Sequence, residues 1–272
     1  MIQTDPESES FVQGILDGNR RMIAKTITLI ESSLKTHQKK AFTVMEKILP
    51  HTGNSIRLGV TGVPGVGKST FIENLGVYLA DMGHKVAVLT IDPTSRRSGG
   101  SILGDKTRME KLAAHKNAFI RPSPAGETLG GVAAKTREIM LTCEAAGFDV
   151  ILIETVGVGQ SETSVASMVD FFLVLMIAGA GDELQGIKKG VLELADGIAI
   201  NKADGDNLKA VEKAKADLDI AMHLIRPESS NWTTPVLTCS SVVEGGTQSV
   251  WETILDHHEK FKDSGVFLLR RK

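Results

Sequence analysis

The stretch Gly62–Ser69 reads GVPGVGKS and matches the pattern GxxxxGK[ST] at every position. The apolar run Ile56–Val60 precedes it, and a helical pattern follows from Lys68. In such a strand–loop–helix unit, glycines let backbone N–H groups surround an anion at the positive end of the helix. The lysine can reach the β- and γ-phosphates of a nucleotide, and the final hydroxyl can bind Mg²⁺. We therefore predict a phosphate-binding loop here rather than a chance glycine turn.

Apolar runs of strand length recur on both sides of this loop. They are continuous rather than alternating, which is typical of strands covered on both faces. Most are separated by helix-length segments, so we predict an α/β P-loop NTPase fold with a doubly wound, mostly parallel sheet of about seven strands. The ligand should lie beyond the carboxyl ends of the strands. The predicted strands are Ile56–Val60, Val86–Ile91, Ala118–Ile120, Val150–Ile153, Phe171–Ile177, Ile198–Ile200 and Val236–Thr238.

The predicted organisation has three parts. Residues 1–50 form an N-terminal helical appendage: Asp5-Pro6 is typical of a helix start, and a further helix runs from about Thr36 to Leu49. Residues 51–260 form the P-loop domain, and residues 261–272 form a C-terminal tail. The role of the proline-rich stretch Arg121–Pro124, which we expect to be a stiff loop, does not follow from the sequence.

The composition argues against several classes of function. The chain has 31 Lys+Arg and 33 Asp+Glu, a net charge of −2, which gives no electrostatic case for nucleic acid or an anionic membrane. Aromatic residues make up only 4%, so base-stacking surfaces are not expected. The two cysteines and the acidic start of the chain favour a cytoplasmic protein over a secreted one, and a matrix protein already stripped of its leader would have the same features.

A guanine-recognition pattern follows the run Ile198–Ile200. Residues 201–204 read NKAD, and the Asp204 carboxylate suits the N–H donors of guanine, which adenine lacks at that edge. Lys202 can lie along the base, and Asn201 can hold the loop. Ser240 and Ser241 end the last strand and are expected beneath the base. The sequence therefore predicts GTP and GDP rather than ATP as ligands.

Carboxylates at strand ends predict a Mg²⁺ site near Ser69. Glu154 ends an apolar strand, and Gly157 stands where a glycine senses the γ-phosphate. Asp92 ends another strand and begins a long polar loop that is typical of a switch. Asp105 in that loop could swing toward the metal, or it could be a helix N-cap.

Two features bear on turnover. Many GTPases place a water-orienting glutamine directly after the sensing glycine, where this chain has Val158, and Gln160 lies farther along. We infer slow intrinsic hydrolysis that a partner could raise. Lys188 lies in Gly179–Gly190, either a partner-facing mobile loop or a plain connection with solvated lysines. It could approach the γ-phosphate or pair with a partner carboxylate.

The candidate residues fall into three sets. The catalytic set is Lys68, Glu154 and Lys188. The nucleotide-binding set is Gly65, Val66, Gly67, Lys68, Ser69, Thr70, Gly157, Asn201, Lys202, Asp204, Ser240 and Ser241. The metal-binding set is Ser69, Asp92, Asp105 and Glu154.

Several stretches together resemble one family. Residues 92–95, which read DPTS, resemble the SIMIBI class of NTPases. Ser98–Arg108, Gly130–Lys135, Glu154–Glu162 and Gly179–Gly190 resemble the methylmalonyl-CoA mutase-associated GTPases, which have also been labelled arginine/ornithine transport-system kinases.

The resemblance implies a GTPase chaperone that loads and protects an adenosylcobalamin-dependent mutase. It implies that Asp92, Asp105 and Glu154 surround Mg²⁺, and that Gly179–Gly190 is a third switch. Family members continue past this tail into a dimerising arm, so a homodimer and a truncated arm are expected.

Three other functions compete with this reading. A kinase of a periplasmic transport protein would need a route to that compartment and a second substrate site with a base. A metal-insertion GTPase would need a His/Cys delivery cluster, which the sequence does not contain. A nucleotide-binding scaffold without hydrolysis would not need the complete set of Lys68, Ser69, Asp92 and Glu154.

Overall fold

A computed structural model describes residues 6–92, 108–124, 129–155, 157, 162–179, 189–225, 232–263, 265, 267 and 271. The strands are β1 (Ile56–Gly62), β2 (Val86–Asp92), β3 (Ala118–Pro124), β4 (Val150–Glu154), β5 (Phe171–Ile177), β6 (Gly197–Asn201) and β7 (Val236–Thr238). The helices are α1 (Pro6–Leu16), α2 (Arg20–Glu31), α3 (Lys35–Ile48), α4 (Lys68–Asp81), α6 (Glu110–Ala114), α7 (Leu129–Ala145), α8 (Glu162–Ala166), α10 (Lys189–Glu193), α11 (Leu208–Ile225) and α12 (Gln248–Lys262), with short 3₁₀ turns at Leu49–His51 and Gly205–Asn207.

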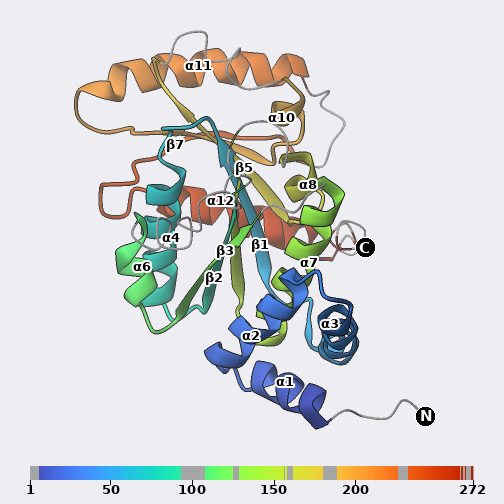
Figure 1. Cartoon of the computed structure of the whole chain (residues 1–272). Helices are drawn as coiled ribbons and strands as arrows, with labels where there is room; N and C mark the ends of the chain where they lie inside the picture. Colours follow the sequence, from blue (N-terminus) through green and yellow to red (C-terminus); the bar gives the residue numbers. More distant parts are fainter. Residues whose placement is uncertain are drawn as a thin grey trace.

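The seven strands form one parallel sheet in the order β3-β2-β4-β1-β5-β6-β7. The predicted α/β fold and strand number are thereby confirmed. The strand β1 lies at the centre between β4 and β5 (Figure 1). Because all strands run the same way, the loops after β1, β4, β5, β6 and β7 leave from one edge, and these loops carry most of the predicted site.

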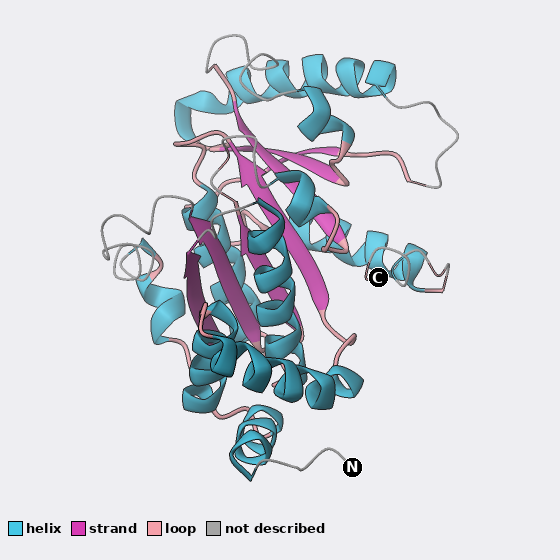
Figure 2. Cartoon of the chain, turned by 45° about the vertical axis from the view of Figure 1, so that its right-hand side comes forward, coloured by secondary structure: helices cyan, strands magenta, loops and turns pink. Residues whose placement is uncertain are grey.

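Helices cover both faces of the sheet (Figure 2). On one face, side chains from α4, α6 and α12 pack on the strands in one buried apolar cluster. On the other face, α7, α8 and α11 join a second cluster that also contains Ile23, Ile27 and Val44 from α2 and α3. The N-terminal helices therefore lie outside the sheet but share an apolar core with α7. None of the helices that the structure describes is both long and apolar enough to cross a membrane.

The stretch Arg121–Pro124 corrects one expectation. It is the second half of β3 rather than a loop, with Pro122 opposite Thr90 and Pro124 opposite Asp92 in β2. Proline has no N–H to donate, but β3 is an edge strand, so one side of it needs no ladder partner. Arg121 in this strand forms an ion pair with Glu31 of α2, which ties the N-terminal helices to the sheet edge.

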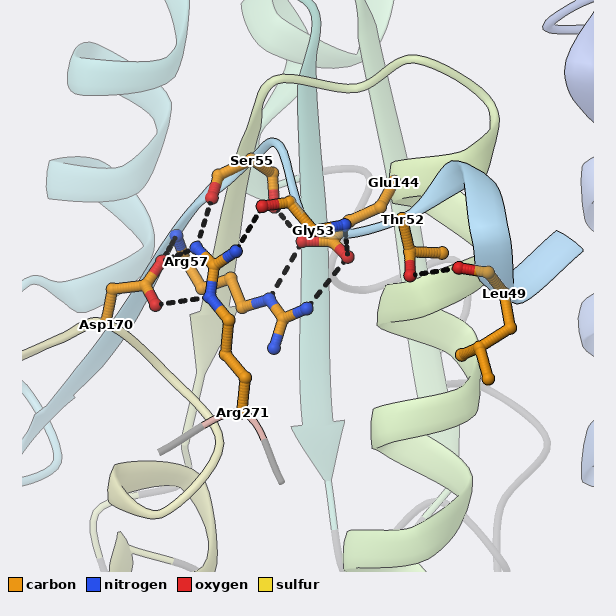
Figure 3. Close-up of polar contacts among 8 residues, drawn as sticks. All are labelled: Leu49, Thr52, Gly53, Ser55, Arg57, Glu144, Asp170 and Arg271. Atoms are coloured by element: carbon orange, nitrogen blue, oxygen red, sulfur yellow. Dashed lines mark hydrogen bonds and ion pairs between the residues drawn. The ribbon is translucent and has the colours of Figure 1, made fainter. Parts of the chain in front are cut away.

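Four charged residues, of which Arg57, Glu144 and Asp170 are buried and Arg271 is partly buried, form a cluster at the amino-terminal edge of the sheet. Figure 3 shows their contacts. The Nε and Nη2 atoms of Arg57 each donate to Glu144 at 2.8 Å, and Ser55 donates to the same carboxylate. Arg271 donates to Asp170 at 2.9 and 2.7 Å. Burial alone would raise the pKa of Glu144, but the hydrogen bonds and charge of Arg57 outweigh it, and the pKa is lowered.

Candidate nucleotide site

The loop between β1 and α4 has the backbone that its glycines predict. Gly65 and Gly67 have φ angles of 83° and 96°, a left-handed region that other residues rarely adopt. Gly67 directly precedes the first residue of α4, so the positive end of that helix faces the loop. Val66 is buried between them, while Thr70 is exposed one residue beyond Ser69. The predicted phosphate loop therefore exists as a local structure.

Lys68 is a buried cation at the centre of this loop. Its Nζ donates to the carbonyl oxygens of Gly62 at 2.7 Å and Val63 at 3.3 Å. Burial lowers the pKa of Lys68, and the nearby carboxylates of Glu154 and Glu162 act in the opposite direction. An ammonium group that is largely removed from water attracts an anion strongly. Lys68 is therefore suited to bind phosphate oxygens.

Ser69 and Glu154 meet because of the strand order. Glu154 ends β4 and lies opposite Val60 of β1, so its carboxylate reaches the start of α4. Ser69 Oγ donates to Glu154 Oε1 at 2.9 Å. A hydroxyl and a carboxylate side by side at a phosphate loop are hard oxygen donors of the kind that Mg²⁺ prefers. The residues present fit the predicted ion.

Gly157 lies against the phosphate loop. Its φ is 82°, and a Cβ atom at this position would lie 1.9 Å from the carbonyl oxygen of Gly62 and 3.1 Å from Lys68 Nζ. A side chain cannot fit there without moving the loop. The backbone at Gly157 therefore lies against Gly62 and Lys68, and its role as a γ-phosphate-sensing glycine stays a prediction.

The residues predicted to recognise guanine contact the phosphate loop. Asn201 Nδ2 donates to the carbonyl of Val66 at 2.9 Å, and Lys202 Nζ donates to that of Gly65 at 3.1 Å. Lys202 has a φ of 61°, which turns the chain sharply after β6. Because Asn201 is buried, the two loops keep a defined spacing.

Ser240 and Ser241 fix the side chains of this second loop. Ser240 Oγ donates to Asp204 Oδ2 at 2.5 Å, and Ser241 Oγ donates to Asn201 Oδ1 at 2.8 Å. Both serines are buried at the end of β7, the neighbour of β6. Asp204 is thus oriented by a residue that follows the neighbouring strand. The structure brings together four predicted residues, Asn201, Asp204, Ser240 and Ser241.

Several predicted residues lie outside the described part of the chain. These are Asp105, Lys188, Val158 and Gln160, together with most of the loop from Gly179 to Gly190. For Asp92 the backbone is described as the last residue of β2, next to β4, which places its Cα at the predicted edge.

Two features of the site escaped the sequence analysis. Thr155 Oγ1 donates to Thr61 Oγ1 at 2.7 Å, which links the ends of β4 and β1. Glu162 at the start of α8 is 2% exposed, and its charge raises the pKa of Lys68 against the larger effect of burial. The apolar residue Val165, three positions later, was the available signal for the burial of Glu162, because residues three apart share a helix face.

Comparison with known proteins decides the family. A family model described as "Methylmalonyl Co-A mutase-associated GTPase MeaB" matches residues 23–272. The chain belongs to this family. The predicted resemblance is thereby confirmed, and the protein is a GTPase of the mutase-associated family.

Relatives span bacteria and animals. GTPase ArgK of Escherichia coli is 50% identical over 265 residues, covering 97% of this chain and 80% of that protein. The mouse protein "Methylmalonic aciduria type A homolog, mitochondrial" is 42% identical over 269 residues, covering 95% of this chain and 65% of its own length. A solved structure described as "LAO/AO transport system kinase" is 40% identical, with a TM-score of 0.83, covering 100% of this chain and 81% of that chain.

Proposed function

We propose that this mutase-associated GTPase hydrolyses GTP with Mg²⁺ and serves as a chaperone for an adenosylcobalamin-dependent methylmalonyl-CoA mutase, loading its cofactor and protecting it from inactivation. One observation carries the nucleotide part: Asn201 and Lys202 bond to the carbonyls of the phosphate loop, so one ligand with a base and phosphates can span both. The mutase part is supported by the family description and by the relatives.

The nucleotide would be held at two ends. Lys68 and the loop N–H groups would bind its phosphates, and Asp204 would accept from the N1–H and N2–H₂ groups of guanine. Ser240 supports this role because its hydroxyl already orients the Asp204 carboxylate. Adenine would leave that carboxylate without donors, which is costly when water is excluded.

Ser69 and Glu154 are the described residues that would hold Mg²⁺, and we propose that Asp92 and Asp105 complete the set. The ion, when bound, would neutralise charge on the β- and γ-phosphate oxygens. Lys68 would stabilise the charge that develops on the same oxygens during hydrolysis. We propose slow turnover in the free protein, because Val158 replaces the usual glutamine, and a partner that raises it.

The central experiment measures binding and hydrolysis of GTP and ATP by the purified protein, with and without a methylmalonyl-CoA mutase holoenzyme. We expect GTP to be preferred, and the mutase to increase GTP turnover and co-elute with the protein in a nucleotide-dependent manner. Equal use of ATP would contradict the guanine assignment. An inert mutase would contradict the chaperone role while leaving the GTPase intact.

We further propose a homodimer in the cytoplasm, with residues 51–260 as the GTPase domain and residues 1–50 as its helical appendage. Sedimentation of the full-length protein with GDP and with GTP tests the oligomeric state.

A further inference from the structure

A pair of buried hydroxyl groups joins β1 to the chain that follows β4. Thr155 Oγ1 donates to Thr61 Oγ1 at 2.7 Å, and the two residues are 1% and 2% exposed. The backbone N–H of Thr155 also donates to the carbonyl of Val60 at 3.0 Å, one residue beyond the end of β4. Thr155 is therefore fixed to β1 by both its backbone and its side chain.

Both threonines stand next to residues of the candidate nucleotide site. Thr61 directly precedes Gly62, the first residue of the phosphate loop. Thr155 directly follows Glu154 and lies two residues before Gly157. Gly157 and Gly62 are in close contact, because a Cβ atom at Gly157 would lie 1.9 Å from the Gly62 carbonyl oxygen. The hydroxyl bond therefore links the two backbone segments just before they meet.

Burial alone does not explain why these two residues are threonines. A buried hydroxyl group costs free energy unless it forms a hydrogen bond. Two valines would fill the same space, and replacing both partners of a buried hydrogen bond by apolar groups of equal shape can be nearly neutral for stability. The threonines add direction instead. Because β-branched side chains have few rotamers, the 2.7 Å bond fixes where the backbone of Thr155 lies relative to Thr61.

We propose that Thr155 is a positioning residue: through its bond to Thr61 it holds the backbone that leads to Gly157 against the phosphate loop before a nucleotide binds. This inference rests on the proposed function and on the predicted role of Gly157 at the γ-phosphate. A segment that is already in place costs less free energy to order when a ligand binds. GTP has the γ-phosphate that Gly157 would contact and GDP lacks it. The bond between Thr155 and Thr61 therefore favours GTP over GDP.

The test removes the hydroxyl group and keeps the shape: Thr155→Val. Dissociation constants for fluorescent GTP and GDP analogues are measured with Mg²⁺ on the full chain. One such hydrogen bond is worth about 1 kcal/mol, so we expect GTP to bind about fivefold more weakly than in the parent, and GDP binding to change less than about twofold. The control Thr26→Val removes another buried hydroxyl, which donates to the Met22 carbonyl at 2.9 Å within α2, and should leave both constants unchanged.

A conservative variant separates positioning from stability. Thr155→Ser keeps the hydroxyl group but loses a buried methyl group, so it should lower the unfolding temperature and yet keep the parental preference for GTP over GDP. An unchanged preference in Thr155→Val would overturn the inference. So would a loss of preference in Thr155→Ser as large as that in Thr155→Val.

A double variant keeps the inference testable if Thr155→Val alone does not fold. Thr61→Val with Thr155→Val removes both partners of the bond, so the protein should fold, and its preference for GTP should again fall about fivefold. A double variant with the parental preference would overturn the inference. Failure of the parent itself to bind guanine nucleotides would instead refute the proposed function.

Discussion

The Asp204 carboxylate is held by Ser240, a residue that follows β7, because Ser240 Oγ donates to Asp204 Oδ2 at 2.5 Å. Asp204→Asn should weaken GTP binding on the order of 10²-fold, about 2.7 kcal/mol, since charge-assisted bonds to guanine are lost. Titration with GTP and ATP measures the change. Asp206→Asn, an exposed acid two residues on, is the control and should bind GTP like the parent. A variant that still prefers GTP as strongly as the parent would refute the guanine assignment.

A second prediction about a single residue concerns Lys68. Lys68→Ala should nearly abolish GTP turnover, because it removes the buried cation that we propose stabilises the transferred phosphate. Steady-state release of phosphate measures this, with Lys209→Ala on the exposed start of α11 as control. Turnover at the parental rate would mean that the phosphates bind at another part of the molecule.

At the scale of elements, α7 is joined to β1 by Glu144 and Arg57, whose side chains are 1% and 4% exposed. Arg57→Ala should lower the free energy of unfolding by about 3–5 kcal/mol, because it leaves a buried carboxylate unpaired. Denaturant unfolding measures the loss. The control Lys215→Ala breaks an exposed pair within α11 and should cost less than about 0.5 kcal/mol. Similar losses in both variants would mean that burial does not govern this pair.

The same pair predicts a pH dependence. The folded protein lowers the pKa of Glu144, so its contribution to stability is complete above the ordinary value and is lost as pH falls through the folded pKa. Unfolding by denaturant should therefore become easier below about pH 4.5. Glu144→Gln should have a shallower dependence in that window. A slope equal to that of the parent would show that other carboxylates control acid stability.

At the scale of the whole molecule, the neighbouring strands β1 and β5 each end at a loop with a predicted function. β1 ends at the phosphate loop, and β5 beside it ends at Ile177, just before the loop that contains Lys188. If that loop contacts a mutase, partner binding and nucleotide state must be linked reciprocally. This link is the basis of the proposed stimulation of turnover.

Lys188→Ala should leave GTP binding by the free protein within about threefold, roughly 0.7 kcal/mol. It should instead reduce the acceleration of hydrolysis by the mutase, because that acceleration has to supply missing charge stabilisation. Turnover is measured with and without mutase for parent and variant. The same fold-activation in both would leave the loop, at most, as a docking surface.

Local sequence determined much of this protein. The phosphate loop Gly62–Ser69, the NKAD residues from Asn201 and the seven apolar runs were all readable from spacing alone. They depend on backbone conformation, glycine placement and apolar periodicity, which are properties of neighbouring residues. The edge of the sheet at which we predict the ligand followed from the parallel order of strands and helices.

Tertiary structure decided the contacts between distant residues. Arg121–Pro124 became part of a strand because β3 lies at an edge, and Glu162 became buried because α8 packs on Gly59. Arg271 reached Asp170, 101 positions earlier, at the amino-terminal edge. Such contacts depend on strand order and helix packing, which minimise exposed apolar area over the whole chain, and a local pattern does not contain that information.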